Sequence, residues 1–178
     1  MSVQTKLAAF DYVVFRLSEW YTERNGQWQN NDLSRLKITK LLFFVTAISS
    51  TPDDPGLLNV FDNFAAMPYG HVESEIQDHM HESINYDISK NSVSFKTGVL
   101  NYQPDPFVDA NMRLSIEQAV AKIKAINYDL INYDAFKLVD LSHRWQSWKT
   151  IFSLAKRNGK FSMPIPRQMI MIEPKILK

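Results

Sequence analysis

The chain has 178 residues, of which 45% are hydrophobic and 22% charged, and its formal net charge is +1. These proportions are typical of a globular domain and exclude a largely disordered chain. The absence of cysteine excludes disulfides, cysteine-ligated metal sites and thiol catalysis. The longest apolar run, Leu41–Ile48, is too short to cross a bilayer, and the first residues lack a signal-peptide pattern. We therefore expect one cytoplasmic domain over residues 1–178 that does not enter a membrane.

Charge is distributed unevenly along the chain. Residues 1–89 contain 6 Lys/Arg and 12 Asp/Glu, whereas residues 90–178 contain 14 and 7. The segment Ser50–Ser89 holds eight acidic residues and no Lys or Arg, and the segment from Arg144 onward holds eight basic residues and one acid. This uneven distribution of charge has two interpretations. It predicts a surface for a charged partner, or else an acidic and a basic patch that face each other or stay solvated.

Two helices are predicted in the first fifty residues. Apolar residues spaced three to four apart predict the first over Val3–Glu23, which ends before Gly26. The second is predicted over Arg35–Ser49, with Ser34 as its N-cap. Its residues are apolar on nearly every side, so we expect this helix at the centre of the core. Prolines and a glycine in residues 50–56 then break the chain.

The middle of the chain gives a weaker pattern. The segment Leu57–Met67 is compatible with an extended stretch or a short helix. A sharp connection at Pro68–Gly70 precedes a third predicted helix over Val72–Tyr86. Alternating apolar and polar residues predict a small β element within Ile88–Tyr102.

Three further helices are predicted in the second half, over Ser115–Ile126, Tyr133–Leu141 and Gln146–Arg157. The tail Phe161–Lys178 is either a short helix packed on the core or an arm that docks on a partner. The predicted fold class is therefore mainly α, with about six helices around one core and a small antiparallel β element.

Candidate metal ligands occur within the third predicted helix. Glu75, Asp78, His79 and Glu82 are spaced i, i+3, i+4 and i+7, which places them on one helical face. Carboxylates and imidazole are metal-ligand types, so this face is a candidate metal or acid–base site. The spacing differs from the H-E-x-x-H zinc pattern, and a solvated acidic face is the simpler interpretation. We expect no metal and no cofactor here, and treat the same four residues as a candidate surface for a protein partner.

Motifs of nucleophilic and phosphate chemistry are absent from the sequence. There is no G-x-S-x-G segment, and the five glycines are isolated from one another. Ser142 and His143 are adjacent in a predicted helical region, where their side chains would diverge rather than form a dyad. We therefore predict no catalytic residues and no enzymatic activity.

A nucleic-acid site is the alternative that the basic C-terminal region offers. Basic residues interleaved with aromatics bind phosphates and stack on bases. Several of these aromatics, however, have the helical spacing of core residues, and the isoelectric point of about 7.9 is modest for a nucleic-acid binder. The basic candidates are Lys149, Lys156, Arg157, Lys160 and Arg167, and the aromatic residues among them are Trp145, Trp148, Phe152 and Phe161.

Three segments resemble the Panacea domain family, which is also described as SocA-like or GepA-like. Leu33–Phe44, with the sequence LSRLKITKLLFF, is similar to the family's opening helix. Phe64–Val72, with the sequence FAAMPYGHV, resembles F-x-A-W-x-Y-G-P-V, with Met67 in place of Trp and His71 in place of Pro. Leu138–Trp148 is a weaker match to a motif containing Ser/Thr-His and a later Trp.

The resemblance implies a function by interaction. Panacea domains are phage-associated antitoxins that neutralise toxins from adjacent reading frames by direct binding, and one branch delivers its toxin to a protease. The pattern carries no catalytic residues. We expect toxin contact on the acidic helix, the loop Asn101–Asn111 or the tail. The alternative is a phage or mobile-element accessory protein that contacts nucleic acid. The residues that we expect to build the shared scaffold are Lys40, Leu41, Leu42, Phe44, Tyr69, Gly70, His143 and Trp148.

Overall fold

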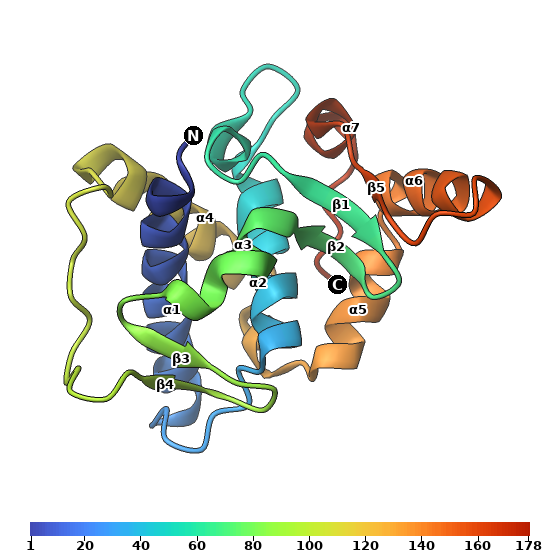
Figure 1. Ribbon diagram of the computed structural model, residues 1–178. Helices are drawn as coiled ribbons and strands as arrows, with labels where there is room; N and C mark the ends of the chain where they lie inside the picture. Colours follow the sequence, from blue (N-terminus) through green and yellow to red (C-terminus); the bar gives the residue numbers. More distant parts are fainter.

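The helices surround a central helix, as a computed structural model of residues 1–178 shows (Figure 1). This central helix is α2 (Arg35–Ser49), with α1 (Val3–Asn25) on one side and α4 (Ala110–Ile126) packed against both. The seven α-helices and two small antiparallel sheets confirm the mainly α class. One cluster of buried apolar residues extends from Leu7 to Leu177. No helix combines the length and apolar character that crossing a bilayer requires.

Local caps define the first two helices much as predicted. The hydroxyl of Ser2 accepts a hydrogen bond from the backbone N–H of Thr5, and that of Ser34 accepts one from Lys37. Each contact satisfies an otherwise unpaired donor of the first helical turn. Gly26 adopts a φ of 80° and ends α1, since this left-handed conformation is strained for other residues. Helix α2 is central, as its composition predicts.

The prediction of a third helix over Val72–Tyr86 is wrong for most of these residues. The first of these residues belong to a hairpin of β1 (Phe64–Met67) and β2 (Gly70–Glu73). Only α3 (Ser74–His79) is α-helical, and a short 3₁₀ turn follows it. All four residues of β2 are buried, so pairing with β1 satisfies their backbone in the interior. This local hairpin pairing prevails over the helical pattern.

The predicted β element is present, although it begins earlier than expected. Strand β3 (Tyr86–Ile88) pairs antiparallel with β4 (Val93–Phe95). Helix α4 also begins earlier than predicted, because the carboxylate of Asp109 caps the N–H of Met112.

The last helices lie on the far side of α2 from α1 (Figure 1). Helices α5 (Ala135–His143) and α6 (Gln146–Arg157) have bounds close to those predicted. The side chain of Asp134 caps α5 by accepting a hydrogen bond from Lys137 N–H.

The tail packs on the chain itself. Strand β5 (Met163–Pro164) adds to the hairpin beside β1, which gives the sheet order β2-β1-β5. Helix α7 (Arg167–Ile172) follows, and its Ile170 is fully buried. The indole of Trp145 donates a hydrogen bond of 3.0 Å to the carbonyl of Ile176. Of the two predicted alternatives for the tail, the structure shows the packed helix.

Candidate functional site

The turn between β1 and β2 brings the three motif segments together. Gly70, at this turn, has a φ of 96°. A Cβ atom at this position would overlap the hydroxyl of Ser142 and would lie 3.2 Å from Nζ of Lys40. Both the backbone conformation and the lack of space therefore require glycine. Lys40, Gly70 and Ser142 belong to three different motif segments.

A buried polar network lies next to this glycine. Nζ of Lys40 donates a hydrogen bond of 2.6 Å to the carbonyl oxygen of His71. The two ring nitrogens of His71 lie 2.8 Å from the hydroxyls of Ser142 and Ser147. All four residues are buried, and the imidazole stacks on Phe43 with ring centroids 3.6 Å apart. Each segment thus supplies a polar group whose partner comes from another segment.

Burial determines the charge state of this network. It lowers the pKa of the Lys40 ammonium to about 7, because removal from water penalises the charged form. Burial, with Lys40 nearby, also holds the pKa of His71 well below its usual value. The imidazole is therefore neutral at pH 7. Since both of its nitrogens have partners, it positions β2 against α5 and α6 and offers no free nitrogen to a ligand.

Ser142 and His143 diverge, as their adjacency in a helix predicts. Ser142 faces the network, whereas Nε2 of His143 lies 3.1 Å from the carbonyl oxygen of Pro68. The indole of Trp148 donates a hydrogen bond of 2.8 Å to the carbonyl of Met67, and its ring stacks on His143. His143 and Trp148 therefore hold the outer side of the hairpin turn.

The remaining scaffold candidates divide into two groups. Leu41, Leu42 and Phe44 are fully buried in the core. Tyr69 is 57% exposed and contacts the exposed ring of Phe136 edge-on. Tyr69, which we expected to build the scaffold, therefore has a ring that forms part of the surface.

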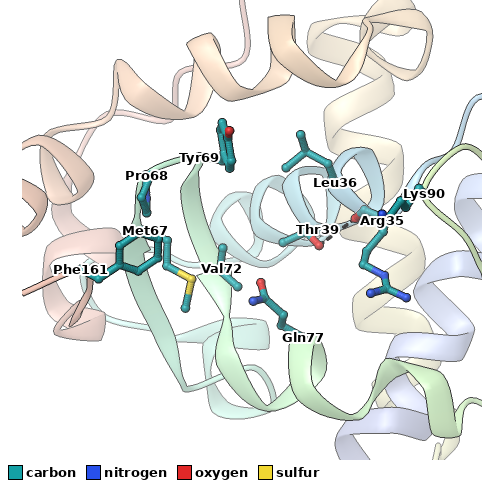
Figure 2. Close-up of a pocket in the computed structure, with 10 residues that line it drawn as sticks. All are labelled: Arg35, Leu36, Thr39, Met67, Pro68, Tyr69, Val72, Gln77, Lys90 and Phe161. Atoms are coloured by element: carbon teal, nitrogen blue, oxygen red, sulfur yellow. Dashed lines mark hydrogen bonds between the residues drawn. The ribbon is translucent and has the colours of Figure 1, made fainter.

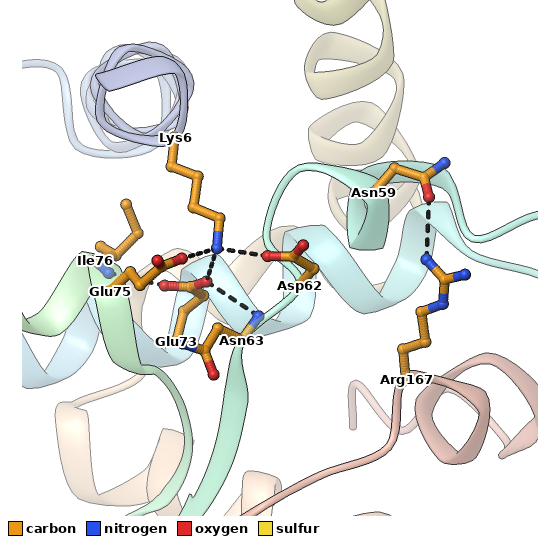
Figure 3. A network of polar contacts seen from close by, with 8 residues as sticks. All are labelled: Lys6, Asn59, Asp62, Asn63, Glu73, Glu75, Ile76 and Arg167. Atoms are coloured by element: carbon orange, nitrogen blue, oxygen red, sulfur yellow. Dashed lines mark hydrogen bonds and ion pairs between the residues drawn. The ribbon is translucent and has the colours of Figure 1, made fainter. Parts of the chain in front are cut away.

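A second polar cluster surrounds Lys6 (Figure 3). Its ammonium lies 2.5 Å from a carboxylate oxygen of Asp62 and 2.9 Å from one of Glu73, and it also pairs with Glu75. Burial disfavours the charged form of Lys6, but hydrogen bonds to the three carboxylates outweigh that effect and raise its pKa. Sequence patterns did not reveal this cluster, because Lys6 and Glu73 are 67 residues apart.

The three carboxylates have the geometry of a cation site. Their ligand oxygens lie within 4.8 Å of one another. Glu73 also accepts hydrogen bonds from the backbone N–H groups of Asn63 and Ile76. The ammonium of Lys6 occupies the position that a metal ion would take, so the cluster links α1 to the hairpin and α3.

The four residues predicted to share one acidic helix face do not lie together in the structure. Helix α3 ends at His79, and Glu75 turns toward Lys6. Nδ1 of His79 lies 2.9 Å from Oε1 of Glu82, which raises the pKa of the imidazole, while Asp78 stays exposed. The four residues therefore do not form one ligand set, which corrects the geometric basis of the predicted metal or acid–base face.

The basic candidates are exposed, but most of the aromatics near them are not available for base stacking. Trp145 is fully buried, and Trp148 stacks between His143 and Phe152. Only Phe161 is largely exposed. All five basic residues lie on the surface of α6, α7 and the connection between them: Lys149, Lys156, Arg157, Lys160 and Arg167.

A groove of about 400 Å³ lies between α2 and the hairpin. Figure 2 shows Leu36 and Thr39 on its α2 side, and Met67 and Pro68 on its hairpin side. Val72 of β2 also lies on the hairpin side. No pattern in the sequence predicts this groove, since its two sides come from different elements.

Comparisons with protein-family models, curated proteins and solved structures find no significant match to this chain.

Proposed function

We propose that this chain is a divergent Panacea-like domain that neutralises a protein toxin, encoded beside it, by direct binding. The convergence of the three motif segments carries the proposal. Lys40 from Leu33–Phe44, Gly70 and His71 from Phe64–Val72, and Ser142 from Leu138–Trp148 meet in one buried network. The three segments thereby share one structural role in the core, and His71, which stands where the family has Pro, takes part in the network.

The orientation of the motif residues supports binding as the mode of action. The titratable side chains of Lys40 and His71 are fully buried and use their polar atoms within the fold. The motifs thus supply a scaffold, and the surface next to it carries the exposed aromatic ring of Tyr69. Tyrosine is enriched in protein interfaces relative to the rest of the surface.

Co-expression tests the proposal. The chain is produced in a host together with the protein encoded beside its gene, and growth and co-purification are measured. We expect the neighbour to stop growth alone, and the chain to restore growth and co-purify with it. A Gly70→Val variant, which cannot accommodate Ser142, should lose both effects together with its folded structure. A toxic neighbour that the wild-type chain neither rescues nor binds would refute the antitoxin function.

The amount of toxin in rescued cells separates two modes of neutralisation. Blocking by stoichiometric binding leaves the toxin level unchanged on an immunoblot. Delivery to a protease lowers that level, and loss of the host protease restores it.

A further inference from the structure

The groove between α2 and the hairpin carries charge of one sign only. The only charged residues among those that line it are Arg35 and Lys90. Arg35 is the first residue of α2, and its backbone N–H donates a hydrogen bond of 2.8 Å to Ser89, the residue before Lys90. The two cations are therefore neighbours at one end of the groove, as Figure 2 shows.

Neither cation has an acidic partner within the chain. All ion pairs of the structure use other cationic side chains. The guanidinium of Arg35 makes only one hydrogen bond, a long one of 3.4 Å to the carbonyl of Ile88. The positive end of the α2 dipole adds to their field. An anionic group at this end of the groove would therefore gain two unpaired partners.

The opposite end is apolar and carries exposed rings. Phe161 is 74% exposed and lies beside Met67 and Pro68 (Figure 2). Tyr69 adds a ring that is more than half exposed, and its contact with Phe136 extends this surface onto α5. Two exposed aromatic rings, Tyr69 and Phe161, therefore line the groove, and aromatic residues are enriched at the energetic centres of interfaces.

We propose that this groove binds an acidic peptide segment of the partner protein. A bulky apolar side chain of the segment packs against Met67, Pro68 and Phe161, while its carboxylates pair with Arg35 and Lys90. The proposal rests on the antitoxin function above. It assigns the toxin contact to a surface that includes Phe161, the first residue of the tail, but none of the candidate acidic residues and no part of the loop Asn101–Asn111.

A peptide fits the groove better than a nucleic acid does. A single strand of nucleic acid needs cations that follow its backbone and open aromatic faces for its bases. Here two cations lie together at one end, and the other lining includes the aliphatic side chains of Leu36 and Val72. Charge at one end and apolar surface at the other match a short segment that carries both acids and one hydrophobic anchor.

Selection from a random-peptide phage library on the full chain tests the groove without the toxin. We expect enriched peptides to combine acidic residues with a large apolar residue, and to bind in fluorescence anisotropy as synthetic peptides. The double variant Arg35→Glu/Lys90→Glu and the variant Phe161→Ala should each weaken binding about tenfold or more. All three residues are exposed, so these variants should keep the wild-type fold.

Matched variants control for charge and for lost apolar surface. Lys122→Glu/Lys149→Glu makes the same change in net charge at exposed residues outside the groove, and Leu114→Ala truncates an exposed apolar residue of α4. Both should bind the peptides as the wild type does. Failure to enrich peptides, or equal binding by the groove variants, would overturn the proposal. Binding of a single-stranded oligonucleotide with the same dependence on Arg35 and Lys90 would also overturn it.

Co-expression with the toxin separates the two proposals. Rescue by the wild type together with equal rescue by the groove variants would refute the groove and leave the antitoxin function in place. Peptide binding that depends on the groove, without rescue by the wild type, would refute the antitoxin function alone.

Discussion

Lys40 donates a hydrogen bond of 2.6 Å to the carbonyl oxygen of His71, and both side chains are fully buried. Through this bond the central helix α2 is tied to the strand β2, 31 residues further along the chain. An unpaired buried carbonyl would cost free energy, and so would an unpaired amine. The bond satisfies both groups at the place where the hairpin meets the core.

Replacing Lys40 with methionine should remove a rise in stability between pH 7 and 9. The pKa of Lys40 is about 7 in the folded chain, against 10.5 for an ordinary lysine. In this window the unfolded chain keeps a proton that the folded chain has released, so the free energy of unfolding rises with pH. The expected rise in the wild type is about 2 kcal/mol from this residue. Urea unfolding at the two pH values measures it, and an equal pH dependence in Lys40→Met would contradict the burial argument.

Gly70→Ala should destabilise the chain much more than Gly98→Ala. Both glycines have a positive φ, but only Gly70 lacks room for a Cβ atom. Backbone strain alone should cost about 1 kcal/mol at Gly98. At Gly70 the clash with Ser142 adds to this strain, for a total of about 3 kcal/mol or more. Thermal and urea unfolding compare the two variants directly. Similar losses of unfolding free energy would show that the turn can accommodate a Cβ atom at position 70.

Lys6→Ala should convert the acidic cluster into a weak cation site. Removing the ammonium leaves three neighbouring carboxylates without compensation, which should cost about 3 kcal/mol or more. Ca²⁺ or Mn²⁺ should then raise the melting temperature of the variant, because carboxylate oxygens are suitable ligands for these ions. The wild type and an exposed-site control, Lys122→Ala, should not respond. A variant that loses little stability and ignores both ions would refute this account of Lys6.

The chain should not bind nucleic acid tightly at physiological salt. Lys149 and Lys156 are exposed, but Trp145 and Trp148 are used for internal packing and hydrogen bonds. Contact through the lysines alone is electrostatic and weakens steeply with salt. An electrophoretic shift at low salt should therefore vanish near physiological salt. A shift that persists, and that a charge reversal at Lys149 and Lys156 removes, would favour the nucleic-acid alternative.

Local signals alone predicted the long helices. The N-cap at Ser34 and the spacing of apolar residues gave α2 its observed bounds, and Asp134 and Gly159 marked the limits of α5 and α6 closely. These signals lie within a few residues of the structure that they determine, because capping and helical periodicity act over one or two turns.

Sequence reasoning failed in two places for different reasons. Val72 and Glu73 read as the start of a helix, yet a tight hairpin pairs them with Ala65 and Phe64 of β1 and makes them a strand. The groove was missed because its sides come from α2 and the hairpin, which are separate elements. A single sequence contains no spacing rule that links such elements.

The sequence by itself determined the helical class, the central place of α2 and the three motif segments. Tertiary structure alone decided that Lys6 would occupy the acidic cluster and that His71 would meet Ser142, 71 residues away. The physical reason is that helices are selected by local hydrogen bonds and periodicity, whereas buried charges and polar groups find their partners only when distant segments pack together.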